Sequence, residues 1–210
     1  IHDLIPEVLG WDMTLPMWAG KIKAIKHASH YLCVSHNTAS DLQKYYQINP
    51  QDMSVSHCGI SSSLKKSSTD EIKNFKEKYN IIKKYFLIVG ERGSYKNIEL
   101  FFKGLIQLVD LDDYEVICLG GQLLIESEFS EYTSKVKTTR IRIHDNEMSA
   151  AYSGAIALIY PSLYEGFGMP IAEAMACECP VITCPNGSIP EVSAEAAIYV
   201  DSNDPEQMHA

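Results

Sequence analysis

The stretch "AIALIYPSLYEGFGMPIAEAMA" (residues 155–176) decides the fold of this 210-residue chain. Its first seven residues form a continuous apolar run, as expected for a strand at the centre of a parallel sheet. Gly166 and Gly168 then allow left-handed backbone and close approach to a ligand. Pro170 suits the first position of a helix. The pattern predicts a buried strand, a glycine turn and a helix in succession.

The same alternation of strand and helix continues in both directions along the chain. The predicted strands are residues 31–35, 53–57, 85–90, 114–120, 139–143, 155–161, 180–184 and 196–200. The predicted helices are residues 17–28, 36–47, 96–109, 123–136, 146–154, 170–177 and 189–192. Ser35 is the expected N-cap of the second helix, with Asn37 as a competing choice. This order predicts an α/β fold with doubly wound parallel sheets.

A segment rich in serine and lysine, residues 60–70, lacks apolar periodicity and is predicted to link two domains. Residues 1–59 are then part of one Rossmann-like domain, and residues 71–210 form a second. The chain starts at an expected strand end and stops where a helix is expected to start. We therefore expect the first domain to be incomplete and the second to lack its closing helices.

Composition excludes several classes of protein. The net charge of −9 argues against a nucleic-acid partner, and no apolar run is long enough to span a bilayer. The first residues lack the pattern of a signal peptide. Six scattered cysteines are typical of reduced, buried thiols in a cytoplasmic protein. Cys177 and Cys179 have no histidine pair nearby at zinc spacing, so the sequence predicts no metal site.

Residues 89–97, "VGERGSYKN", place Arg92 and Lys96 between a strand and the start of a helix. Backbone N–H groups at a helix start attract anions, and these two side chains supply full charges for a diphosphate. Alone, the segment is better explained as an ordinary loop with solvated basic residues. It is not a Walker loop. No G-x-G-x-x-G follows the first strand of either half, which argues against an NAD-linked Rossmann enzyme.

Two glutamates, Glu165 and Glu173, lie eight positions apart on either side of the glycine turn. Glu165 could simply complement the helix dipole, and Glu173 could be a surface residue. However, Glu173 belongs to a mostly apolar helix, where a carboxylate needs a partner. Vicinal sugar hydroxyls would serve. Residues 184–192, "CPNGSIPEV", form either an ordinary turn or a ligand loop and add weight only together with the other two segments.

Taken together, "PSLYEGFGMPIAEAMACECPVIT" and "NGSIPEV" resemble the signature of retaining GT-B glycosyltransferases, in particular family 4 (glycosyl transferases group 1), with a mannosyltransferase-like character. Glu165 and Glu173 match the family's E-x7-E motif. "YFLIVGERGSYKN" resembles the strand and phosphate loop that open the donor domain. Residues 1–59 resemble the end of the acceptor-side domain, and "IHDLIPE" its His-Asp loop. The resemblance covers nearly the whole chain and is most specific in residues 161–192.

The resemblance implies transfer of a hexosyl unit from a GDP- or UDP-linked sugar to a glycan or lipid-linked acceptor, with retained configuration and without a metal or other cofactor. Glu173 would hold the ribose hydroxyls, and Lys96 with Arg92 would neutralise the diphosphate. His2, followed directly by Asp3 at an expected strand end, would face the donor sugar, although a loop histidine is more often structural. Contacts to the transferred sugar and phosphates would come from Glu165, Gly166, Phe167, Gly168, Met169 and Pro170.

Some positions depart from the family pattern. Glu91 stands where many members carry arginine, which leaves the role of Arg92 open, and Glu178 stands where glycine is common. Two alternatives remain: a nucleotide-sugar-binding module without turnover, and a GT-B nucleotide-sugar epimerase. The glycine-rich E-x7-E region favours transfer. We expect a cytoplasmic protein. The basic stretch "KIKAIKHA" (residues 21–28) leaves open a peripheral contact with the inner face of the membrane.

Overall fold

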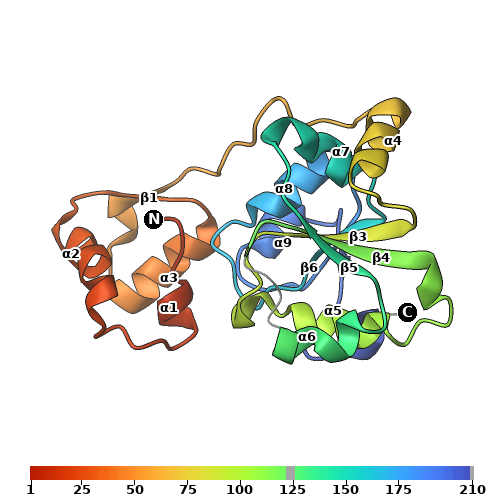
Figure 1. Cartoon of the computed structure of the whole chain (residues 1–210). Coiled ribbons are helices and arrows are strands. Elements are labelled where there is room, and N and C mark those ends of the chain that lie inside the picture. Colours follow the sequence, from red (N-terminus) through yellow and green to blue (C-terminus); the bar gives the residue numbers. More distant parts are fainter. Residues whose placement is uncertain (122–125, 209–210) are drawn as a thin grey trace. The chain divides into compact units, whose positions relative to one another are not determined.

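The computed structural model describes residues 1–121 and 126–208 (Figure 1). The chain divides into two compact units. The first unit comprises Ile1–Gly59, Tyr164–Gly168 and Asn186–Val192. The second unit comprises Ile60–Leu163, Met169–Pro185 and Ser193–Ala210.

The second unit is built on a six-stranded sheet with the order β5-β4-β3-β6-β7-β8, in which all neighbours are parallel. The strands are β3 (Lys84–Val89), β4 (Tyr114–Leu119), β5 (Thr138–Ile141), β6 (Ala157–Tyr160), β7 (Val181–Thr183) and β8 (Ile198–Tyr199). The apolar run that was expected at the centre is β6, and it does lie at the centre beside β3. The prediction of an α/β fold with parallel sheets is confirmed.

Helices cover both faces of this sheet. The helices are α4 (Thr69–Lys78), α5 (Ile98–Leu105), α6 (Glu126–Thr133), α7 (Met148–Ser153) and α8 (Met169–Ala176). Figure 1 shows α4, α7 and α8 on one face and α5 and α6 on the other. On the second face Phe102 and Tyr132 stack with ring centroids 5.8 Å apart. On the first, the buried Tyr85 hydroxyl donates to the carbonyl of Ala151 at 2.7 Å. The central strands β3, β4 and β6 are mostly apolar because both faces of the sheet are covered.

Several boundaries differ from the predictions. The helix expected at residues 96–109 is α5, which is shorter because Ser94–Lys96 form a 3-10 turn and Asn97 adopts a left-handed φ of 54° at the N-cap. The helix expected at residues 123–136 is α6, and residues 122–125 lie outside the described part. Helix α8 begins at Met169, so Pro170 is its second residue rather than its first. Proline is tolerated there because first-turn N–H groups have no partner inside the helix.

Helix α4 was not predicted and begins inside the expected linker. Its start is fixed by a capping box, in which the Ser68 hydroxyl accepts from the backbone of Glu71 and the Glu71 carboxylate accepts from the backbone of Ser68. This reciprocal pair satisfies two N–H groups that a helix start leaves free. The Ser-x-x-Glu pattern was the available signal, and the serine- and lysine-rich composition around it masked it.

The first unit contains a parallel pair of short strands and three α-helices from its N-terminal segment, with α9 (Ile189–Ser193) contributed from further along the chain. Its other elements are α1 (Ile5–Val8), α2 (Ala19–His27), β1 (Tyr31–Cys33), α3 (His36–Tyr46) and β2 (Met53–Val55). Both strands are shorter than predicted. Ser35 is the N-cap of α3, because its hydroxyl accepts from the backbone N–H of Thr38 at 3.0 Å. The competing choice of Asn37 is wrong.

The start of the chain is not the predicted strand end. His2 and Asp3 lie in no strand, and the Asp3 carboxylate accepts the N–H of Ile5 at the beginning of α1. A short side chain that accepts a local backbone N–H favours a turn or helix start over a strand. The carbonyl of Ile1 still accepts from the backbone of Val34.

The six cysteines are free, and all except Cys58 are buried. Burial raises the pKa of the Cys118 thiol to about 11, against the opposing effect of Arg92 and Arg140. The Cys118 thiol therefore remains protonated at neutral pH. No helix within residues 1–121 and 126–208 combines the length and apolar character needed to cross a bilayer.

We expect Ser68→Ala to lower the free energy of unfolding by about 1 kcal/mol, because it removes the hydroxyl half of the α4 capping box. Urea unfolding measures this. Ser130→Ala, at an exposed position of α6, is the matched control and is expected to change stability by less than about 0.5 kcal/mol. Equal stability of the two variants would contradict the role of the box.

Candidate functional site

Lys96 lies at the carboxyl edge of the second unit's sheet. Parallel strands bring the residues that follow them to one edge, which is where open α/β sheets bind ligands. The Lys96 Nζ, in the turn after β3, donates to the hydroxyl of Tyr160 at the end of β6, at 3.2 Å. It also lies 5.0 Å from the ring centroids of Tyr95 and Tyr160. The ammonium group is therefore held at the junction of β3 and β6.

Two guanidinium groups converge on the glycine turn that follows β4. Arg92 Nη1 donates to the carbonyl of Gly120 at 3.0 Å. Arg140, from β5, donates through Nε to the same carbonyl at 3.4 Å and through Nη2 to that of Gly121. The turn has φ of 68° at Gly120 and 63° at Gly121, which glycine adopts without strain.

Arg92 keeps unused hydrogen-bonding capacity. Its Nε and Nη2 are buried and have no hydrogen-bond partner within residues 1–121 and 126–208. Buried donors without partners cost free energy, and the oxygens of a bound anion would satisfy them. With Lys96 and Arg140, this arginine makes the edge of the sheet suited to a phosphate-bearing ligand.

Glu173 projects from α8 and has a defined partner. Its Oε2 accepts from the hydroxyl of Tyr152, a buried residue of α7, at 2.8 Å. Burial, helped by the Glu173 charge, raises the pKa of Tyr152, so this hydroxyl remains a donor at physiological pH. The sequence indicated that the Glu173 carboxylate needs a hydrogen-bond partner, and Tyr152 is that partner. A carboxylate accepts about four hydrogen bonds, so Glu173 can still accept from a ligand.

The glycine turn after β6 belongs to the first unit and is packed against its own chain. The carbonyl of Gly166 accepts from the hydroxyls of Ser35 and Thr38 at 2.7 and 3.1 Å. A Cβ atom on Gly166 would lie 1.8 Å from the carbonyl oxygen of His2. The close approach predicted at Gly166 is therefore made by the protein itself. Gly168 has a φ of 94°, whereas Gly166 lies outside the left-handed region that was expected for it.

The neighbours of this turn are fixed in the same unit. The Tyr164 hydroxyl bonds to the carboxylate of Asp41 in α3. Glu165 is 6% exposed, and its backbone carbonyl accepts from the N–H and the hydroxyl of Ser188 at 3.3 and 3.0 Å. The ring of Phe167 lies 5.7 Å from that of His57. The segment is thus held by side chains that are distant in sequence.

The predicted site residues fall into two groups. The second unit contains Arg92, Lys96, Met169, Pro170 and Glu173, and the first unit contains His2, Glu165, Gly166, Phe167 and Gly168. His2 is exposed. Their roles toward a ligand stay predictions. The sequence analysis did not identify Arg140, Tyr152 and Tyr160. Their contacts at the sheet edge are with residues distant in sequence, and the residues next to them in the chain give no sign of such contacts.

These features define a class: an α/β protein with parallel sheets, a cationic carboxyl edge and a carboxylate on the helix beyond a glycine turn. Residues 83–210 match the family described as glycosyl transferases group 1. The chain belongs to this family.

Named relatives and a solved structure agree with this membership. The chain is 35% identical over 186 residues to the O-antigen chain mannosyltransferase RfbU of Salmonella typhimurium, covering 86% of this chain and 49% of the relative. It is 28% identical to the O-antigen chain mannosyltransferase B of Escherichia coli, covering 100% and 58%. The chain thus spans about half the length of the curated relatives it matches.

The fold resembles that of Anabaena Alr3699/HepE, solved in complex with UDP-glucose, with a TM-score of 0.82 and 16% identity, covering 100% of this chain and 59% of that one. At that identity the likeness concerns the fold alone. The prediction of GT-B architecture is confirmed.

We expect Gly166→Ala to destabilise the first unit by about 1–3 kcal/mol, because the new methyl group must displace the His2 backbone. Gly59→Ala is the matched control, since a Cβ there meets nothing within 4 Å. Urea unfolding followed by tryptophan fluorescence measures both. A Gly166→Ala variant as stable as the control would show that the backbone approach is not a constraint.

Proposed function

We propose that this chain acts as part of a retaining glycosyltransferase, which moves a hexosyl unit from a GDP- or UDP-linked sugar to a glycan or lipid-linked acceptor. The observation that carries this proposal is the carboxyl edge of the sheet, which bears Lys96 and two buried Arg92 donors that have no partner in the described part of the chain. The relatives named as O-antigen chain mannosyltransferases favour a mannosyl donor and a polysaccharide product.

The cationic edge suits a diphosphate leaving group. When the bond to the sugar breaks, negative charge builds on the terminal phosphate oxygen, and fixed cations stabilise that charge without reorganisation. Lys96 is already oriented by Tyr160, and Arg92 by Gly120. Arg140 adds a second guanidinium on the same turn. Because these side chains supply the positive charge, we propose transfer that does not require a metal.

Glu173 suits the ribose of the donor. A carboxylate accepts hydrogen bonds from two adjacent hydroxyls, and the hydroxyl of Tyr152 fixes one carboxylate oxygen beforehand. Preorganisation of this kind reduces the entropy that binding must overcome. Tyr152 therefore acts as a positioning residue for Glu173.

The remaining roles rest on family membership. We propose that Glu165 and the backbone of residues 166–170 contact the transferred sugar and its phosphates, and that His2 faces that sugar. We also propose a cytoplasmic enzyme with peripheral contact at the inner membrane face. Support for this contact comes from α2, where Lys23 and Lys26 are exposed while Lys21 pairs with Glu7 at 2.8 Å.

We expect Lys96→Ala to weaken binding of GDP or UDP by about ten- to a hundredfold, the usual effect of losing a charged hydrogen bond. Binding of the free nucleoside should not change. Calorimetry with both ligands measures the ratio, and Lys103→Ala, an exposed lysine paired with Glu99, is the control. If nucleoside and nucleoside diphosphate weaken equally, Lys96 does not bind the diphosphate.

We expect Glu173→Gln to reduce the preference for a ribonucleotide over its 2′-deoxy counterpart, because the ribose hydroxyl loses its charged acceptor. Tyr152→Phe should reduce the same preference by a smaller factor, since it leaves the Glu173 carboxylate in place and removes only the hydrogen bond that orients it. Glu178→Gln, an exposed carboxylate just beyond α8, is the matched control. The affinity ratio of the two nucleotides is the measurement. An unchanged ratio in Glu173→Gln would refute the ribose assignment.

Turnover separates the three functions that the sequence left open. Incubation with a nucleotide sugar and an acceptor glycan, followed by NMR, should show release of the nucleoside diphosphate as a transferase moves the sugar to the acceptor. An epimerase would convert the donor into an isomer, and a binding module would leave it unchanged.

A further inference from the structure

Three potential metal ligands come together in the first unit, and none of them is among the residues proposed to bind the donor, although the ring of His57 lies 5.7 Å from that of Phe167. The ligand atoms of His36, His57 and Glu191 all lie within 4.8 Å of one another. Nε2 of His57 is 2.6 Å from Oε1 of Glu191. His36 opens α3, His57 follows β2, and Glu191 belongs to α9.

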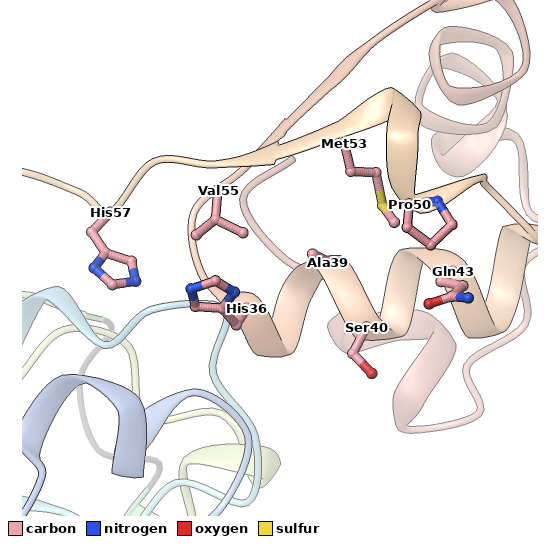
Figure 2. Close-up of a pocket in the computed structure, with 8 residues that line it drawn as sticks. All are labelled: His36, Ala39, Ser40, Gln43, Pro50, Met53, Val55 and His57. Atoms are coloured by element: carbon pink, nitrogen blue, oxygen red, sulfur yellow. The ribbon is translucent and has the colours of Figure 1, made fainter.

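Solvent can reach the two histidines. Both are exposed, and Figure 2 shows them at the same end of a groove that runs along α3. Both histidines line this groove. The two imidazole rings are nearly perpendicular, with centroids 6.0 Å apart. An ion could therefore enter without any opening of the core.

Glu191 is fixed and ionised. Its two carboxylate oxygens accept the backbone N–H groups of His36 and Asn37 at 2.8 and 3.2 Å. Burial raises the pKa of Glu191, but these bonds and the one from His57 outweigh burial and hold the pKa below its usual range. The carboxylate therefore keeps its negative charge at neutral pH and is already oriented.

We propose that His36, His57 and Glu191 bind a divalent transition-metal ion of the zinc type. Two imidazoles and one carboxylate are a ligand set that zinc accepts, with water in the fourth position. Imidazole ligands also favour zinc, nickel or copper over magnesium, which prefers oxygen ligands. None of the three residues belongs to the proposed donor site, so this inference goes beyond the proposed function and does not depend on it.

The geometry requires only small side-chain movements. Tetrahedral zinc with bonds of about 2.0–2.2 Å places its ligand atoms about 3.3 Å apart. The 2.6 Å contact between His57 and Glu191 must open slightly, and the longer distances, at most 4.8 Å, must close. Rotation of two exposed rings achieves both. The ion takes the place of the hydrogen bond between His57 and Glu191, and because zinc binds deprotonated ligands its binding weakens at low pH.

A bound ion would connect distant parts of the chain. Glu191 is 134 residues from His57 and 155 residues from His36. Because the unfolded chain does not hold these groups together, binding should stabilise the folded first unit.

Calorimetry with metal-stripped chain and zinc chloride tests the proposal. We expect one zinc ion per chain, a higher melting temperature, and no competition from excess magnesium chloride. His57→Ala and Glu191→Gln should each weaken zinc binding at least about tenfold. His27→Gln, an exposed histidine of the same unit, and Cys58→Ser, the partly buried thiol next to His57, should bind zinc as the parent chain does.

Absorption of bound cobalt(II) gives a second measurement that does not depend on stability. Tetrahedral cobalt with nitrogen and oxygen ligands should show visible bands without the near-ultraviolet band of a thiolate. Three results would overturn the proposal. The first is no zinc uptake, which leaves only the contact between His57 and Glu191. The second is equal uptake by the parent, His57→Ala and Glu191→Gln chains, and the third is loss of uptake in Cys58→Ser.

Discussion

The parallel pairing of β3 with both β4 and β6 is the constraint on which the second unit depends. Leu87 of β3 pairs with Ile117 on one side and Leu158 on the other, and all three are fully buried. Strands covered on both faces admit few polar residues, so chemistry is possible only where they end. The parallel direction brings those ends to one edge, where Lys96 and Arg92 lie. The fold thus concentrates cations at one place in a chain whose net charge is −9.

Backbone carbonyl groups of glycine turns then orient the polar side chains. In the second unit the carbonyl of Gly120 accepts from both Arg92 and Arg140. In the first unit the carbonyl of Gly166 accepts from the hydroxyls of Ser35 and Thr38. Glycine is required at each turn for a different reason: Gly120 needs a positive φ, and Gly166 needs room for the backbone of His2. In the proposed donor site, a main-chain carbonyl group orients the Arg92 side chain before any ligand binds.

The sequence predicted the helices and strands better than it predicted the contacts between their side chains. Every strand of the six-stranded sheet was predicted, most of them from an apolar run, because burial on both faces leaves a continuous local pattern. Helix α4 was missed because only Phe75 of its residues is fully buried, which leaves little periodicity. A close approach to a ligand was predicted at Gly166, and the close approach that the structure shows there is that of the His2 backbone. Arg140 and the grouping of His36 with Glu191 could not be predicted, because such contacts join residues that are far apart in sequence.

We have proposed that the carboxyl edge of the second unit's sheet binds a nucleotide diphosphate sugar. Thermal unfolding of the chain in the presence of GDP- and UDP-linked hexoses tests this most directly. A ligand that binds only the folded state stabilises it by about 2.7 kcal/mol at a hundred times its Kd. We predict that one of these nucleotide sugars raises the melting temperature progressively with concentration. A melting temperature that no nucleotide sugar changes, at any concentration, would contradict it.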